Sequence, residues 1–336
     1  MKLAALSIII ILLSFQDILS KIDIHDLYKF RHIVKFYKGD SVHIVIKSKD
    51  GEEAKKKPIL FFVQGSLPKP LFLFDDKDVY EVFPFNPNIL TENYHLAIIG
   101  KPYIPLSADI KKLGQNFSYI EDSTGKFPKA YSDRNLPDYY VNRNIEILEF
   151  LLKQDWVDNS KLIVAGHSEG SNIATRIASK FKKVTHLIFA AGNPYGRIVT
   201  MIQQNRSRES YDDSTHYAEN EFQYWQEAIN NKNNMDDTYG DTFKATYDFS
   251  EPLIPYLVKL KIPVLIVYGT KDWSAPYIDL MRVDFIRQGK DNFTYYPIVG
   301  AEHNFFPKDA SGKINNEIFN WDKVAKFWNN WIIDNN

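Results

Sequence analysis

The sequence contains no cysteine. Disulfide bonds, thiolate nucleophiles, iron–sulfur clusters and cysteine-based zinc sites are therefore excluded. It also has almost no excess of either charge, with 41 lysines and arginines against 42 aspartates and glutamates. Since nucleic-acid-binding proteins are usually basic, no nucleic-acid partner is predicted. The eight histidines form no His-Glu-x-x-His pair, and we expect neither a metal nor a cofactor.

The apolar run at the N-terminus is too short to cross a bilayer. It has 13 residues, from Leu3 to Phe15, whereas a membrane-spanning helix needs about 20. A basic start at Lys2, this short run and the small residue Ser20 are typical of a secretory signal peptide. We expect residues 1–20 to be removed, the mature protein to be secreted or periplasmic, and no stable membrane insertion afterwards. An uncleaved anchor or a buried first helix are the alternatives.

The chain has the composition of a globular protein. Hydrophobic residues make up 44% and charged residues 25% of its 336 residues, which is enough to build a large core. Six apolar runs predict buried strands, and helical segments alternate with them. This alternation predicts a mostly parallel sheet covered by helices. The predicted strands are 58–63, 95–100, 162–165, 186–191, 263–268 and 293–298, and the predicted helices are 138–155 and 171–180.

Further elements are expected towards both ends of the chain. Residues 32–37 and 42–48 look like strands, and Lys38-Gly39-Asp40 between them predicts a hairpin turn. A last helix is expected near the C-terminus. Its apolar residues are Ile318, Val324, Phe327, Trp328 and Trp331.

A long segment without strand character separates the fourth and fifth buried runs. An ordinary crossover between parallel strands needs only about a dozen residues, so we expect an insertion that forms a helical cap. The predicted division is a core of residues 21–197 and 259–336 and a cap of residues 198–258. Aromatic residues of the cap either line a pocket or, as we favour, form the packing face of a helix. These residues are Tyr217, Phe222, Tyr224 and Trp225.

The predicted cap is strongly acidic. Eleven carboxylates and four basic side chains give residues 198–258 a net charge of −7. A negative field beside a cleft attracts cations and repels anions. This predicts a preference for neutral or cationic substrates over anionic ones, and the alternative is a solvated lid without influence on specificity.

The candidate nucleophile is Ser168. It lies in Gly166-His167-Ser168-Glu169-Gly170, a Gly-x-Ser-x-Gly pentapeptide with a predicted strand before it and a predicted helix after it. This is the setting of a nucleophile elbow, in which the serine backbone is strained and neighbouring segments approach too closely for side chains at the two glycines. A tight turn with a capping serine is the alternative.

A serine hydroxyl needs a base before it can attack a carbonyl carbon. His303 follows the last buried strand, in a loop that can lean over the sheet edge where Ser168 is expected. The other histidines near the predicted elements are less well placed, since they lie inside the elbow, at the start of a strand or in the cap. His303 is therefore the candidate base, although a lone histidine is more often structural.

The base in turn needs a carboxylate that holds its tautomer and stabilises its cation. Asp272 follows the fifth buried strand in Gly269-Thr270-Lys271-Asp272. The corner after the fourth strand, Gly192-Asn193-Pro194, offers no carboxylate. Asp272 is therefore the candidate acid, and a simple turn aspartate is the alternative.

A tetrahedral oxyanion needs two preorganised N–H donors. The first expected donor is the backbone N–H of Glu169, at the start of the helix after the nucleophile. The second is the backbone N–H of Ser66, in the loop Gln64-Gly65-Ser66-Leu67-Pro68 after the first buried strand. A plain turn in this loop is the alternative.

The order of these motifs along the chain resembles that of the α/β-hydrolase superfamily. The resemblance covers residues 30–336 and is carried by the elbow at Ser168, by Gly269–Asp272 and by Gly300–His303. It implies an eight-stranded, mostly parallel sheet flanked by helices, a cap inserted after the sixth strand, and hydrolysis through an acyl-enzyme. Many members have His-Gly where this chain has Gln64-Gly65, which is a departure in the oxyanion loop.

The sequence thus predicts a secreted serine hydrolase that cleaves carboxylic esters with Ser168, His303 and Asp272. Its expected partner is a small-molecule ester or amide. A small capped peptidase or amidase with the same triad is the first alternative, followed by a thioesterase and by a non-catalytic binding protein of the same fold. The acyl chain, the leaving group and the oligomeric state are not encoded in these motifs.

Overall fold

A computed structural model describes residues 29–81, 83–211, 214, 216–238 and 240–335 of the chain. The predicted signal peptide, residues 1–20, lies outside them. Within the described part of the chain, no helix is both long and apolar enough to cross a membrane.

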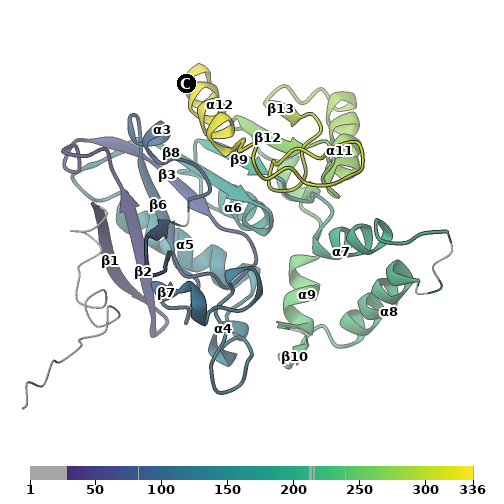
Figure 1. Cartoon of the computed structure of the whole chain (residues 1–336). Helices are drawn as coiled ribbons and strands as arrows, with labels where there is room; N and C mark the ends of the chain where they lie inside the picture. Colours follow the sequence, from purple (N-terminus) through teal and green to yellow (C-terminus); the bar gives the residue numbers. More distant parts are fainter. Residues whose placement is uncertain (1–28, 82, 212–213, 215, 239, 336) are drawn as a thin grey trace, which may run out of the picture.

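A single eight-stranded sheet forms the centre of the molecule (Figure 1). Its order is β1-β2-β6-β3-β8-β9-β12-β13, and only the pairs β1–β2 and β2–β6 are antiparallel. The strands are β1 (Phe30–Tyr37), β2 (Asp40–Lys47), β3 (Lys57–Val63), β6 (His95–Ile99), β8 (Val157–His167), β9 (His186–Ala190), β12 (Val264–Gly269) and β13 (Phe293–Ile298). This arrangement confirms the predicted α/β class and its mostly parallel sheet.

Helices cover both faces of the sheet because successive strand residues point to opposite faces. In β3, Ile59 and Phe61 pack with one core cluster, and Leu60 and Phe62 pack with the other. The first cluster includes α5 (Pro137–Leu151), α6 (Glu169–Lys180) and α11 (Ala275–Arg287), and the second includes α3 (Asn88–Thr91) and α12 (Trp321–Asp334). The continuous apolar runs of the central strands follow from this double coverage.

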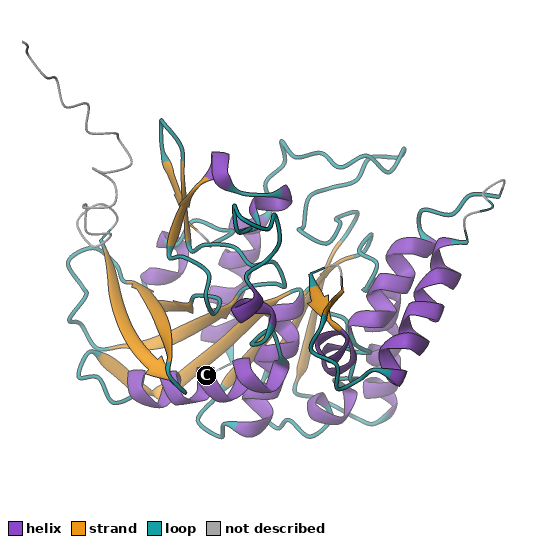
Figure 2. Cartoon of the chain, turned by 90° about the horizontal axis from the view of Figure 1, so that it is seen from below, coloured by secondary structure: helices purple, strands orange, loops and turns teal. Residues whose placement is uncertain are grey.

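The segment between β9 and β12 forms the predicted helical insertion. Figures 1 and 2 both show its helices gathered beside one end of the sheet. The predicted cap limits, 198 and 258, fall just after the start of α7 and just after the end of α10. The elements are α7 (Arg197–Arg206), α8 (Tyr217–Asn230), β10 (Asp237–Thr238), β11 (Asp241–Thr242), α9 (Phe243–Phe249) and α10 (Ile254–Leu257).

Short elements between β3 and α5 were not predicted, because three or four residues carry no measurable periodicity. A three-stranded sheet combines β4 (Phe72–Phe74), β5 (Val79–Glu81) and β7 (Ser107–Asp109). Besides α3 and the predicted strand β6, this region contains the 3₁₀ turns Ile110–Lys112 and Gln115–Phe117 and the helix α4 (Lys129–Ser132).

Two details of the predicted core differ in the structure. Strand β13 is half-buried rather than buried, because it lies at the edge of the sheet and has one neighbour, β12. Ile318 does not belong to the last helix, which begins at Trp321, and its side chain is exposed.

Helix α12 should be anchored mainly by Trp328. Its side chain is 0% exposed, and its ring lies 5.7 Å from that of Phe85 and 6.2 Å from that of Trp321. We expect Trp328→Ala to lower the free energy of unfolding by about 3–5 kcal/mol. Urea denaturation followed by circular dichroism measures this. Ile333→Ala on the same helix is the control, since Ile333 is 47% exposed, and equal losses in the two variants would contradict the packing described here.

Candidate active site

The turn between β8 and α6 presents Ser168 at the carboxyl edge of the sheet. The serine backbone has φ 57° and ψ −126°, a conformation that costs a non-glycine residue about 1–3 kcal/mol. Two backbone hydrogen bonds hold it: the Ser168 N–H donates to Ala190 O at 2.9 Å, and the Ser171 N–H donates to Ser168 O at 3.0 Å.

The two glycines of the pentapeptide are required by close backbone approach. A Cβ at Gly166 would lie 2.1 Å from the carbonyl oxygen of Gly170, and a Cβ at Gly170 would lie 2.1 Å from that of Val63. Both atoms belong to the backbone and cannot move aside cheaply. Only residues without a side chain therefore allow α6 to start against strand β3.

The structure brings Ser168, His303 and Asp272 together in one chain of hydrogen bonds. The distance from Ser168 Oγ to His303 Nε2 is 2.9 Å, and that from His303 Nδ1 to Asp272 Oδ2 is 3.0 Å. Ser168 follows β8, Asp272 follows β12 and His303 follows β13. These strands run parallel and lie in the order β8-β9-β12-β13 in the sheet. The carboxyl ends of parallel strands meet at one edge, so residues far apart in sequence converge there.

Burial and pairing shift the pKa values of Asp272 and His303 in opposite directions. Burial raises the pKa of Asp272, but hydrogen bonds from His303 and Ser274 and the charge of His303 hold it below its usual value. Burial lowers the pKa of His303, but the hydrogen bond and the charge of Asp272 raise it above 6.5. Asp272 therefore stays ionised and stabilises the imidazolium form of His303.

His167, inside the pentapeptide, has a role that the sequence did not indicate. Its Nε2–H donates to the carbonyl oxygen of His303 at 3.0 Å, and the two rings lie 5.1 Å apart. Burial lowers the pKa of His167 to about 3, so the ring is neutral at ordinary pH. It ties the loop of His303 directly to the elbow.

The two expected oxyanion donors lie next to the nucleophile. Glu169 is the first residue of α6, so its N–H has no acceptor within the helix. The loop of Ser66 lies against Ser168, since a Cβ at Gly65 would lie 3.5 Å from Ser168 Cβ. Ser66 and Glu169 line the same pocket as Ser168 and His303.

Two buried side chains hold the loop of Ser66 from behind. The carbonyl oxygen of Ser66 accepts hydrogen bonds from the Tyr131 hydroxyl at 3.0 Å and from Lys101 Nζ at 3.4 Å. Burial lowers the pKa of Lys101 to about 8. These contacts were not predicted, because neither residue belongs to a recognisable motif.

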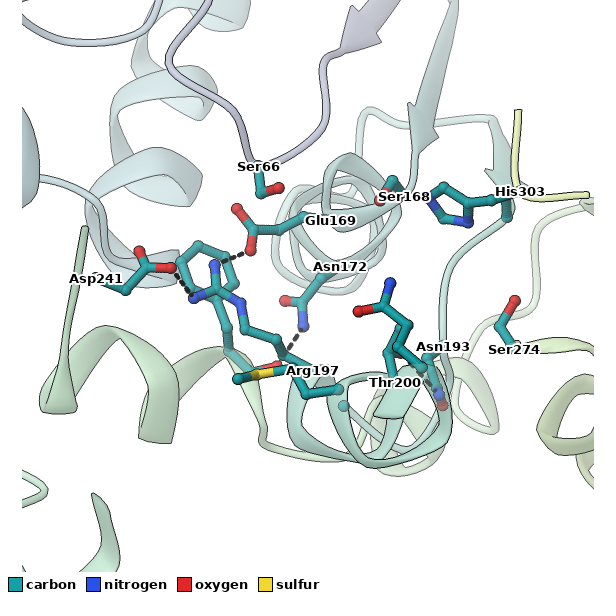
Figure 3. Close-up of a pocket in the computed structure, with 15 residues that line it drawn as sticks. Ser66, Ser168, Glu169, Asn172, Asn193, Arg197, Thr200, Asp241, Ser274 and His303 are labelled. Atoms are coloured by element: carbon teal, nitrogen blue, oxygen red, sulfur yellow. Dashed lines mark hydrogen bonds and ion pairs between the residues drawn. The ribbon is translucent and has the colours of Figure 1, made fainter. Parts of the chain in front are cut away.

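The pocket beside Ser168 is small, and most of the residues that line it are polar (Figure 3). Its volume is about 260 Å³, near or below the lower end of the usual range for ligand sites. Besides the residues already described, it is lined by polar side chains from α6, the turn between β9 and α7, α7 itself and the strand β11. They are Asn172, Asn193, Arg197, Thr200, Gln204 and Asp241.

Arg197 lies between two carboxylates of this pocket. It forms ion pairs with Glu169 and, at 2.9 Å, with Asp241 Oδ2. Burial lowers the pKa of Arg197, but the charges of Asp241 and Glu169 hold it above its usual range. In the part of the chain that the structure describes, no group of three histidine, aspartate or glutamate side chains could hold a metal ion.

The four cap aromatics singled out in the sequence do not line this pocket, whereas Phe249 of α9 does. Trp225 stacks on Tyr247 with ring centres 6.0 Å apart, and the Tyr224 hydroxyl lies 2.9 Å from Thr246 Oγ1. Tyr217 and Phe222 are exposed. The favoured interpretation, in which they pack within the cap, therefore fits Tyr224 and Trp225.

Neither a protein-family model nor a curated protein matches this chain, but solved structures do. Est1E from Butyrivibrio proteoclasticus, in a complex with ferulic acid, aligns with a TM-score of 0.53 and 16% identity. The alignment covers 90% of this chain and 98% of Est1E. The chain has the α/β-hydrolase fold.

Other proteins with the α/β-hydrolase fold align equally well. For the acylaminoacyl peptidase of Pyrococcus horikoshii the TM-score is 0.55 and the identity 12%, over 94% of this chain and 44% of the peptidase. For the thioesterase domain of the curacin biosynthetic pathway the values are 0.50 and 11%, over 91% and 99% of the two chains. At these low identities, the structural similarity confirms the expected fold but does not show a shared activity.

The environment of His303 predicts its titration. Because Asp272 raises its pKa, we expect the midpoint of His303 above 6.5 in histidine-selective NMR. His167 should stay neutral through the same titration, since its pKa is lowered to about 3. A midpoint of His303 at or below 6.5 would contradict the pairing with Asp272.

Proposed function

We propose that the protein is a secreted serine hydrolase that cleaves carboxylic esters through an acyl-enzyme. The observation that carries the proposal is the unbroken path of hydrogen bonds from Ser168 Oγ through His303 to Asp272, beside a pocket. A nucleophile, a base and an orienting carboxylate in this order can activate a hydroxyl group at neutral pH.

In the proposed reaction, neutral His303 accepts the proton of Ser168 through Nε2 while Ser168 Oγ bonds to the ester carbonyl carbon. The carbonyl oxygen becomes an oxyanion, and the N–H groups of Ser66 and Glu169 donate hydrogen bonds to it. The imidazolium then gives its proton to the departing alcohol oxygen as the carbon–oxygen bond breaks. Water, deprotonated by His303, cleaves the acyl-enzyme by the same route and restores Ser168.

The shared fold does not distinguish an ester from a peptide as substrate, because Est1E with ferulic acid bound and the acylaminoacyl peptidase align about equally well. The same triad could cleave an amide, so a panel of matched esters and amides decides between the two activities.

We further propose that residues 1–20 direct secretion. The support is the pattern of a basic residue, a short apolar run and a small residue in the sequence. N-terminal sequencing of the exported protein tests this, and an exported chain that keeps its first 20 residues would overturn cleavage at this site.

Replacing the nucleophile tests the proposed activity. Ser168→Ala should lower kcat by about a thousandfold or more, because the other triad members cannot form the acyl-enzyme. Hydrolysis of a chromogenic acetate ester measures this, with circular dichroism as a check of folding. Ser160→Ala, at an exposed site outside the pocket, is the control. A folded Ser168→Ala protein with wild-type activity would exclude the assignment.

Asp272 should matter for rate more than for stability. In Asp272→Asn the amide favours the wrong tautomer of His303, and kcat should fall by about 10⁴-fold. The free energy of unfolding should change far less, because asparagine has nearly the same shape. Steady-state kinetics and urea denaturation on the same preparation separate the two effects. If Asp272→Asn keeps full activity, the acid lies elsewhere.

A further inference from the structure

The pocket beside Ser168 has an imbalance of charge in its lining. Its ionisable side chains besides His303 are Glu169, Arg197 and Asp241, so two carboxylates face one guanidinium. Lys101 lies behind the oxyanion loop, with its ammonium group 3.4 Å from Ser66 O, and does not line this pocket.

Both terminal nitrogens of Arg197 are already paired with carboxylates. It forms ion pairs with Glu169 and Asp241, and its guanidinium carbon lies 4.4 Å from the ring centre of Phe249. Its side chain is only 14% exposed. An anionic substrate would have to compete with two carboxylates for this cation, so Arg197 is poorly suited to bind one.

Glu169 lies between Arg197 and, in an adjoining cavity, Lys101 and Arg143, and only one of its two oxygens has a hydrogen-bond partner among the described residues. Its side chain is 9% exposed, and Oε2 pairs with Arg197. Its other oxygen, Oε1, is buried and has no hydrogen-bond partner among the described residues. Leaving a buried acceptor unpaired costs free energy, and a donor supplied by a bound ligand would recover it.

Glu169 lies where the acyl part of a substrate is expected. Figure 3 shows Glu169 and Arg197 on the opposite side of Ser168 from His303. His303 protonates the leaving group in the proposed reaction, so the leaving group belongs on its side and the acyl group on the other. The volume of about 260 Å³ suits a short acyl group better than a long hydrocarbon chain, and Glu169, Arg197 and Asp241 offer polar contacts to it.

We propose that Glu169 Oε1 accepts a hydrogen bond from a protonated amine on the acyl group, so that short amine-bearing acyl esters are the preferred substrates. This inference rests on the proposed esterase function and adds a substrate class to it. It attributes the predicted preference for cationic substrates to a direct contact in the pocket rather than to the net charge of the cap.

The acidic cap contributes less to this preference than its net charge suggests. Several of its carboxylates are paired with basic side chains, which reduces their distant field. The pairs are Glu209 with Arg206, Asp248 with Lys244 and Glu251 with Arg176. Fields from exposed charges are also screened by salt over about 10 Å, whereas a buried contact is screened much less.

The experiment compares esters that differ only by an ammonium group in place of a methyl group. Alanine methyl ester is paired with methyl isobutyrate, and β-alanine methyl ester with methyl butyrate. At pH 7, below the α-amino pKa of about 7.7–8.0, most of each amine is protonated. The ratio of kcat/KM within each pair is measured for the wild type and for variants, because the intrinsic reactivity of an ester cancels in that comparison.

Glu169→Gln keeps the backbone N–H and removes the charge. We expect it to lower the amine-to-methyl ratio by about tenfold or more in at least one pair, at low salt and at high salt. Asp241→Asn should also lower the ratio, and it provides a second test if Glu169→Gln does not fold. Glu219→Gln is the control, since Glu219 is an exposed carboxylate of the same cap and should leave the ratio unchanged.

The outcomes separate this inference from the proposed function. If wild type hydrolyses the neutral esters but neither Glu169→Gln nor Asp241→Asn changes either ratio, the inference is overturned and the esterase function stands. A decrease in the amine-to-methyl ratio that disappears at high salt, or that Glu219→Gln also causes, would attribute the preference to the electrostatic field of the cap. That result would also overturn the inference. If wild type hydrolyses no ester and fails to react with a serine-directed phosphonate, the proposed function itself fails.

Discussion

The strained backbone of Ser168 is the constraint on which the site depends. At φ 57° the serine stands at a sharp corner between β8 and α6, and this corner exists only because Gly166 and Gly170 let backbone segments pass within contact. The hydrogen bond from the Ser168 N–H to Ala190 O ties the corner to strand β9. The loop of Ser66 also lies against the serine, so Ser66, Ser168 and Glu169 line one pocket.

Pairs of charged and polar side chains fix the positions of the other residues around Ser168. Asp272 raises the pKa of His303 despite its burial, while His167 remains neutral and holds the same loop through its carbonyl oxygen. On the other side of Ser168, Arg197 is fixed between two carboxylates. Ser168 thus lies between the pair of His303 and Asp272 on one side and a carboxylate with an unpaired oxygen on the other. In the proposed reaction, this asymmetry distinguishes the two halves of an ester.

The sequence predicted the elements that have a strong local signal. The strands of the large sheet could be located from apolar runs, and Asp272 and His303 could be chosen because each follows a parallel strand, at the edge where Ser168 lies. The contacts of Arg197 could not be predicted, since its partners Glu169 and Asp241 lie 28 and 44 residues away. Asp241 lies in a two-residue strand of the insertion, which is too short to show a periodic pattern. The clamp of Tyr131 and Lys101 on Ser66 depends equally on tertiary packing.

The measurement that tests the central claim most directly is the trapping of the acyl-enzyme. The protein is mixed with a reactive ester, quenched in acid within the first turnover, digested and analysed by mass spectrometry. The account predicts that the peptide containing Ser168 gains the mass of the acyl group and loses it again as turnover is completed. Ester hydrolysis without any acylated Ser168, or with the acyl group on another residue, would contradict it.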